Sequence, residues 1–313
     1  MKAIQFLTIT ALGAALFASC SNEEELTRGS YPNDNIIRVT AGVNNMTRGN
    51  EATTALNKDF SLNVVNSTND NYSYANEIFS LKGGTEWSST NKLLWENLAT
   101  PVEIVALYPA TDANTFADVF SKESNSYGTI SYGVKPDQST RDDANDLLLY
   151  HNTSFVPKDD LKAGKLDIQF NHAFCRVDIE VTIGSEFNAT NGLAANPIQG
   201  IKVEGTKTTA EIDFTSTAPF FTVTPSASEE VTSITPTLDD FTQAASATDQ
   251  AVAKYSCIVI PQTATLKVVL HTSDMEYEWT GTQMELESGK QYTLQLNMKK
   301  SATTRNFILR ERK

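Results

Sequence analysis

The chain has 313 residues, of which 38 are acidic and 25 are basic, so its formal net charge at pH 7 is −13. This surplus of negative charge repels a phosphate backbone and argues against a nucleic-acid partner. The length allows one large or two ordinary domains. Abundant Asn, Ser and Thr, without a sustained 3.6-residue apolar period, predict a mostly β protein.

The first 19 residues have the pattern of a secretory signal peptide. Met1 and Lys2 give a charged start, residues 3–18 are apolar, and small residues end the run. The apolar stretch is short for a membrane span. We therefore expect the chain to be exported.

The leader ends in a distinctive pentapeptide, Leu16-Phe17-Ala18-Ser19-Cys20, which resembles the lipobox of bacterial lipoproteins. The resemblance implies that Cys20 carries lipid, becomes the mature N-terminus and anchors the chain in the outer membrane. Glu23-Glu24-Glu25 follows and is similar to the surface-export signal of Bacteroidetes lipoproteins, although an acidic run is also what a solvated tether looks like. We take residues 20–35 as an acidic tether and favour the outward-facing leaflet, at the cell surface.

The first expected strand has one apolar face. Ile37, Val39, Ala41 and Val43 alternate with Arg38, Thr40 and Gly42, which is typical of a half-buried strand. Losing this strand would leave an open apolar groove. The tripeptide Thr-Arg-Gly stands on both sides of it, with Arg28 before and Arg48 after.

Further strands are expected along the rest of the chain. Residues 156–160 are polar, contain a proline and form a plausible boundary, which divides the chain into domains at 36–157 and 158–299 with a tail at 300–313. Leu166, Ile168 and Phe170 have the opposite parity to the run from Ala173 to Ile183, so a β-bulge or bend is expected near 171–172. Short strands at this spacing predict β-sandwiches. The expected strands and hairpins are at 60–64, 78–95, 102–108, 129–132, 146–150, 198–203, 210–214, 220–223, 254–260, 266–272, 277–279 and 292–298.

Residues suited to catalysis or metal binding form no pattern in the sequence. His151, His172 and His271 lie in separate segments, and we interpret His172 as a hydrogen-bonded structural residue. The pairs 142–143, 159–160 and 239–240 are acidic but lack the alternating spacing of a calcium loop, which favours solvated turns. Cys175 and Cys257 could form a disulfide, but their apolar surroundings favour buried free thiols. We therefore expect no catalytic residues, metal or cofactor.

Several short segments of the sequence together resemble motifs of the fimbrillin-type proteins of Bacteroidetes. They occur in the expected order over nearly the whole chain, and the most specific is Phe170-Asn171-His172-Ala173-Phe174-Cys175-Arg176-Val177. The others are Trp87 and Trp95, Ala106-Leu107-Tyr108-Pro109, Asp146-Leu147-Leu148, Ile260-Pro261-Gln262 and Gly289-Lys290-Gln291-Tyr292-Thr293-Leu294.

The resemblance implies two transthyretin-like β-sandwich domains in tandem and a role as a surface pilus subunit. In that family an arginine-specific protease removes the N-terminal strand, and a strand from a neighbouring subunit fills the groove. Arg48 matches the cleavage position because it follows the strand, whereas Arg28 fits less well and is better read as a loop arginine. The tail offers Phe307-Ile308-Leu309 as a donor, but it departs from the family pattern by lacking a tryptophan-containing close. The choice between stalk, tip and anchor subunit stays open, as does the host or bacterial surface ligand.

A lipid-anchored glycan-binding protein is the alternative from another class. Such proteins use exposed aromatic rings as sugar platforms, and Trp87, Trp95 and Trp279 are the candidates. Three solvent-facing rings on one surface would favour glycan binding, whereas three buried rings would favour the pilus subunit.

Overall fold

The computed structural model describes residues 34–44, 56–83, 86–110, 120–121, 126–215, 220–300 and 307–311. In these ranges the fold is all-β, as expected, and the helical elements are short. They are α2 (Pro157–Asp160) and the 3-10 turns η2 (Asp70–Tyr72), η3 (Asp143–Asn145) and η4 (Ser185–Phe187).

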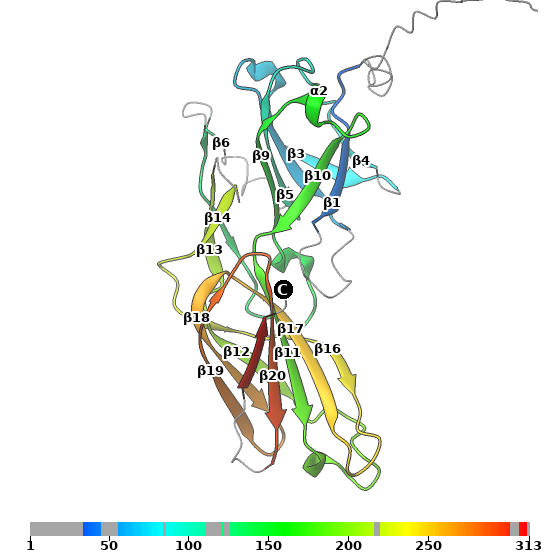
Figure 1. The fold of residues 1–313 in the computed structure, drawn as a ribbon, viewed down its shortest axis with the longest axis vertical. Helices are drawn as coiled ribbons and strands as arrows, with labels where there is room; N and C mark the ends of the chain where they lie inside the picture. The colour runs from blue at the N-terminus through cyan, green and yellow to red at the C-terminus, as the bar shows by residue number, and fades with distance from the viewer. Residues whose placement is uncertain are drawn as a thin grey trace, which may run out of the picture.

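Seven strands between residues 39 and 172 close into a barrel, at the top of Figure 1. We expected a sandwich here. The all-β fold is consistent with that expectation, and the strand pairing adds that the sheet is closed, because its first strand pairs with β10 on one side and reaches β4 on the other. In spatial order the strands are β1 (Val39–Val43), β10 (Leu166–His172), β9 (Leu148–Phe155), β5 (Val102–Tyr108), β2 (Phe60–Val65), β3 (Tyr74–Leu81) and β4 (Trp87–Ser89).

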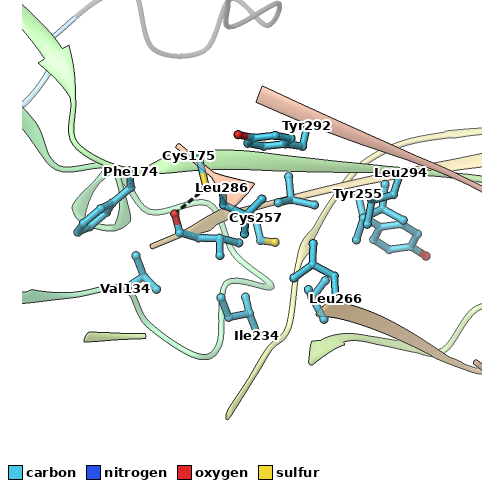
Figure 2. Close-up of a cluster of buried hydrophobic side chains, with 14 of the residues drawn as sticks. Val134, Phe174, Cys175, Ile234, Tyr255, Cys257, Leu266, Leu286, Tyr292 and Leu294 are labelled. Carbon is cyan, nitrogen blue, oxygen red and sulfur yellow. Dashed lines mark hydrogen bonds between the residues drawn. The ribbon is translucent and has the colours of Figure 1, made fainter. Parts of the chain in front are cut away.

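The second half of the chain forms a two-sheet sandwich, at the bottom of Figure 1. Figure 2 shows side chains from both sheets pointing into one buried space. The transthyretin-like arrangement remains a prediction. One sheet has the order β16 (Thr237–Thr242), β17 (Ala251–Val259), β11 (Cys175–Ile183), β20 (Gln291–Met298) and β21 (Phe307–Glu311), and the other β15 (Thr232–Ile234), β12 (Gly200–Thr206), β18 (Gln262–His271) and β19 (Glu276–Leu286).

A three-stranded sheet joins the two halves. It has the order β14 (Phe221–Pro225), β13 (Thr209–Phe214) and β8 (Ile130–Gly133), so a hairpin from the second half pairs with a strand from the first. A small hairpin of β6 (Phe120–Ser121) and β7 (Ser126–Tyr127) precedes β8.

Strand β5 is buried on both faces, which connects the two hydrophobic cores. Ile104 and Ala106 belong to the barrel core, whereas Val105 and Leu107 belong to the core of the sandwich. The next barrel strand, β9, divides in the same way, with Leu148 in the barrel core and Leu149 in the other. This double burial explains the continuous apolar runs in the sequence.

The change of parity between β10 and β11 marks the passage from barrel to sandwich. Leu166, Ile168 and Phe170 point into the barrel core, and Cys175 and Val177 point into the sandwich core. A bulge or bend was expected near 171–172, and the chain bends at residues 173–174, directly after β10. The domain boundary at 156–160 stays a prediction; this segment contains α2 between two barrel strands, and β10 pairs within the barrel.

The two cysteines described by the structure are buried free thiols, as expected. Cys175 Sγ donates a hydrogen bond to the Val259 carbonyl at 3.1 Å, and Cys257 lies in the same core (Figure 2). Burial raises the pKa of the Cys257 thiol, which makes it unreactive in the folded protein.

Candidate functional site

Strand β1 closes the barrel, and the structure holds it differently on its two sides. Toward β10 it runs parallel through five residue pairs, from Val39↔Leu166 to Val43↔Phe170. Toward β4 it makes one ladder pair, Val39↔Trp87. Just before the strand, the Ile37 amide donates to the Leu93 carbonyl at 3.0 Å and the Trp95 amide donates to the Asn35 carbonyl at 2.8 Å. Without β1, the other six strands would present two open edges.

The inward side chains of β1 cover an aromatic floor. Ile37 and Val39 are buried, and Ala41 and Val43 are partly buried against the same core. Beneath them the Phe60 ring lies 4.9 Å from Trp87 and 5.6 Å from Phe170, between ring centroids. Burying one such aliphatic side chain is worth about 1.5–3 kcal/mol. Removing β1 would therefore uncover a strongly apolar groove, as the alternation of the sequence predicted.

The outward side of β1 contacts polar residues of β10. Thr40 Oγ1 donates to Asp167 Oδ1 at 3.3 Å, and Asn44 Nδ2 donates to Asn171 Oδ1 at 2.9 Å. Asp167 also accepts from Lys162 Nζ and Gln169 Nε2, each at 2.7 Å. Burial alone would raise the pKa of Asp167, but these hydrogen bonds outweigh it and hold the pKa below its ordinary value. Asp167 is therefore a fixed negative charge beside β1.

An exposed ion pair lies at the start of β1. Arg38 donates from both terminal nitrogens to the Asp34 carboxylate, at 2.9 and 2.6 Å. These hydrogen bonds lower the pKa of Asp34 to about 2. Both side chains are solvent-accessible, so we assign the pair little stabilising effect.

Cys20, Arg28 and Arg48 lie outside the residues that the structure describes. The residues that flank 45–55 are well anchored. On the β1 side the Asn44 amide donates to the Phe170 carbonyl at 2.8 Å. On the other side Leu56 packs into the barrel core, and Tyr108 Oη accepts from the amides of Asn57 and Lys58. A cut at Arg48 would therefore fall between two fixed points of the barrel.

The expected donor segment is strand β21. Phe307, Ile308 and Leu309 lie in it, and it pairs antiparallel with β20 at the edge of the five-stranded sheet, from Leu296↔Phe307 to Tyr292↔Glu311. In this structure the segment therefore occupies an edge of its own chain (Figure 1).

Each histidine pairs with a carboxylate, and the three pairs belong to different parts of the fold. His172 Nδ1 lies 3.0 Å from Asp146 Oδ1 in a buried contact, which confirms the structural role expected for it. His151 Nε2 lies 2.6 Å from Glu103 Oε1, and the half-exposed His271 pairs with Glu276. Among the described residues no group of three or more His, Cys, Asp or Glu side chains could hold a metal ion.

The three tryptophans are buried. Trp87 and Trp95 belong to the barrel core and Trp279 to the sandwich core, with exposed fractions of 7%, 3% and 4%. None offers an open ring face for a sugar. This is the outcome that we expected to favour a pilus subunit over a glycan-binding protein.

The acidic pairs of the sequence lie in turns and at the junction of the two halves. Asp160 accepts from the Val156 amide within its own turn. Asp239 accepts from Arg141 at 2.7 Å and from Arg176 at 3.2 Å, so it links the loop before β9 to the sandwich. Gln138 was not predicted from the sequence; its Nε2 donates to the Ile258 carbonyl and its Oε1 accepts from the Ile258 amide across the same junction. A lone glutamine in a loop carries no signal of that role.

Asp142 gives a testable pH dependence. The hydrogen bond from Lys135, the Ala144 amide and the hydrogen bond from Lys58 hold its pKa well below the usual range. A carboxyl with a lowered pKa stabilises the fold above its unfolded-state pKa of about 4, and this contribution is lost as the pH falls through the folded pKa. We expect Asp142→Asn to lower the free energy of unfolding at pH 7 by about 1 kcal/mol and to flatten its acid dependence, measured by urea titration. The exposed Asp159→Asn is the control; equal effects of the two substitutions would contradict the assignment.

No helix among the described residues is long and apolar enough to cross a membrane.

Comparisons with known proteins agree on one family. The sequence matches the family model described as fimbrillin-like over residues 40–308. No curated protein matches the sequence. A crystal structure of a candidate cell adhesion protein from Bacteroides uniformis superposes with a TM-score of 0.59 at 14% identity, covering 89% of this chain and 98% of that one. One from Bacteroides ovatus gives a TM-score of 0.56 at 13% identity, covering 90% and 97%. At these identities the structures support the fold alone.

Proposed function

The chain belongs to the fimbrillin-like family, and we propose that it is a structural or adhesive subunit of a cell-surface pilus. Its partners are other pilus subunits, and its work is assembly and adhesion rather than catalysis. Export as a lipoprotein would attach Cys20 to the outer membrane before assembly.

The proposed assembly step is protease-triggered strand exchange. Cutting after Arg48 would separate β1 from the rest of the barrel, and an extended segment of a neighbouring subunit would then take its place. Added strands of this kind satisfy open edges through ladder hydrogen bonds and fill the vacated groove with alternate side chains. The observation that carries the proposal is the position of β1, which closes the barrel between β10 and β4 over an aromatic floor.

The alternative within this proposal is that β1 is not removed. If β1 stays in place, the chain would serve as a lipid-anchored, non-polymerising anchor subunit. The glycan-binding alternative receives no support from the three buried tryptophans.

The N-terminal residue and intact mass of the protein on cells test the proposal. We expect a start at Gly49, and we expect Arg48→Ala to leave a lipid-modified start at Cys20 with the rest of the chain intact. Arg28→Ala is the matched control, because the same Thr-Arg-Gly tripeptide surrounds it, and it should leave the Gly49 start unchanged. A wild-type chain that begins at Cys20 in assembled pili would contradict processing at Arg48.

A further inference from the structure

The outward face of β10 presents three polar side chains in a row beside β1. Asp167, Gln169 and Asn171 are alternate residues, and we call them the polar ladder. Thr40 contacts the first, Gly42 lies in register with the second, and Asn44 contacts the third. Each outward position of the bound strand therefore meets a different polar side chain, a carboxylate at Asp167 and amides at Gln169 and Asn171.

Position 42 of the bound strand, opposite Gln169, favours a small residue. A Cβ at position 42 would lie 3.2 Å from Gln169 Oε1, which is closer than an ordinary contact. The Gln169 amide is held by a hydrogen bond from its Nε2 to Asp167 Oδ1 at 2.7 Å. A larger residue at position 42 would have to push the Gln169 side chain aside by a few tenths of an ångström and would strain that hydrogen bond.

The polar ladder can distinguish two positions of the bound strand that differ by a shift of two residues, whereas the apolar groove cannot. A slip of one residue would turn Val39 and Ala41 outward and is rejected by the groove itself. A slip of two residues keeps apolar side chains inside, but it places Thr40 or Asn44 beside Gln169 in place of Gly42. The contacts of the ladder therefore disfavour shifts of two.

We propose that Asp167, Gln169 and Asn171 select the register and the identity of any strand that enters the place of β1. The fitting segment has a hydrogen-bond donor, a small residue and an amide at three successive outward positions, with apolar residues between them. This inference rests on the proposed function, because it assumes that β1 can be replaced.

The chain's own tail does not fit this ladder. In the direction of β1, parallel to β10, any register that turns both Phe307 and Leu309 into the barrel core positions of Val39, Ala41 and Val43 places Ile308 or Arg310 opposite Gln169. Both side chains are large. We therefore infer that the occupant is a strand of a different protein, which runs parallel to β10 as β1 does.

An exchange experiment on the whole chain tests the proposal. Residues 45–50 are replaced by a site for a sequence-specific protease, the folded protein is cut, and a fluorescent peptide of residues 35–45 competes with the bound strand. We expect Gly42→Val in the peptide to weaken binding about tenfold, and Thr40→Val or Asn44→Leu about threefold. Gln169→Ala in the protein should restore the affinity for the Gly42→Val peptide, while the affinity for the wild-type peptide should stay nearly unchanged. A peptide of residues 305–313 should bind more than about tenfold more weakly than the β1 peptide.

The outcomes separate this inference from the proposed function. Binding of the wild-type peptide with no effect of the three substitutions would overturn the ladder, and tight binding of the tail peptide would overturn the choice of a different partner. Failure of every peptide to exchange would contradict strand exchange itself. The intact chain then still tests the ladder, since Gly42→Val should lower its urea midpoint and Gln169→Ala should restore it. No rescue in the intact chain would overturn the role of Gln169.

Discussion

Replacing Val39 by aspartate should unfold or misprocess the protein. The Val39 side chain is 2% exposed and lies where β1 meets both β10 and β4. The substitution loses about 2 kcal/mol of apolar burial and places a carboxylate in the barrel core, which adds several kcal/mol unless the group becomes neutral. We expect the free energy of unfolding to fall by about 4 kcal/mol or more, measured by urea titration at pH 7.

Val231→Asp is the matched control for this prediction. Val231 is 60% exposed, so the same change of side chain there should alter stability by less than about 0.5 kcal/mol. Normal folding and export of the Val39→Asp protein would contradict the burial of β1. Equal losses at both positions would show that the substitution acts through net charge instead.

The local character of β1 could be predicted from the sequence, but its partner could not. Alternation of Ile37, Val39, Ala41 and Val43 identified one buried face, and the structure buries that face. The parallel pairing of β1 with β10 joins residues more than a hundred positions apart, and no local pattern reports such a contact. The closure of the barrel follows from that pairing, so the sequence alone could not predict it.

The apolar runs of β5 and β9 correctly predicted buried strands, but they did not show that each strand contributes to two cores. The apolar run through Val105, Ala106 and Leu107 predicted a buried strand. It could not indicate that the two faces belong to different cores. The change of parity near 171–172 likewise predicted a bend, which the structure has at 173–174, but it could not indicate that the chain passes there from one core to the other.

Strands β15 and β16 were missed because their outward residues are polar and their apolar residues are few. β16 reads Thr-Leu-Asp-Asp-Phe-Thr, and its exposed Leu238 does not contribute to a core. Its place at the sheet edge comes from pairing with β17, whose own sequence is strongly apolar. A partner strand, and not local propensity, determines such an edge.

The aromatic floor of the barrel is held together by contacts that do not involve β1. Phe60 stands at the centre of the aromatic floor, fully buried, stacked on Phe79 at 5.3 Å and in contact with Trp87 and Phe170. These ring contacts join β2, β3, β4 and β10, which all remain when β1 is removed. Only the inward side chains of β1 that cover the floor would be lost. The floor should therefore hold the groove in shape for an incoming strand.

Phe60→Ala should be the most damaging substitution in that floor. It removes a ring that joins three other aromatic side chains and leaves a cavity that close-packed strands cannot fill, so we expect a loss of about 3–5 kcal/mol in the free energy of unfolding. Phe60→Leu keeps most of the volume and should cost about 1.5 kcal/mol or less. Urea titration of both proteins checks the ranking. Equal losses would contradict the ranking, because they would show that an aliphatic side chain of similar volume cannot replace the ring contacts of Phe60 with Phe79, Trp87 and Phe170.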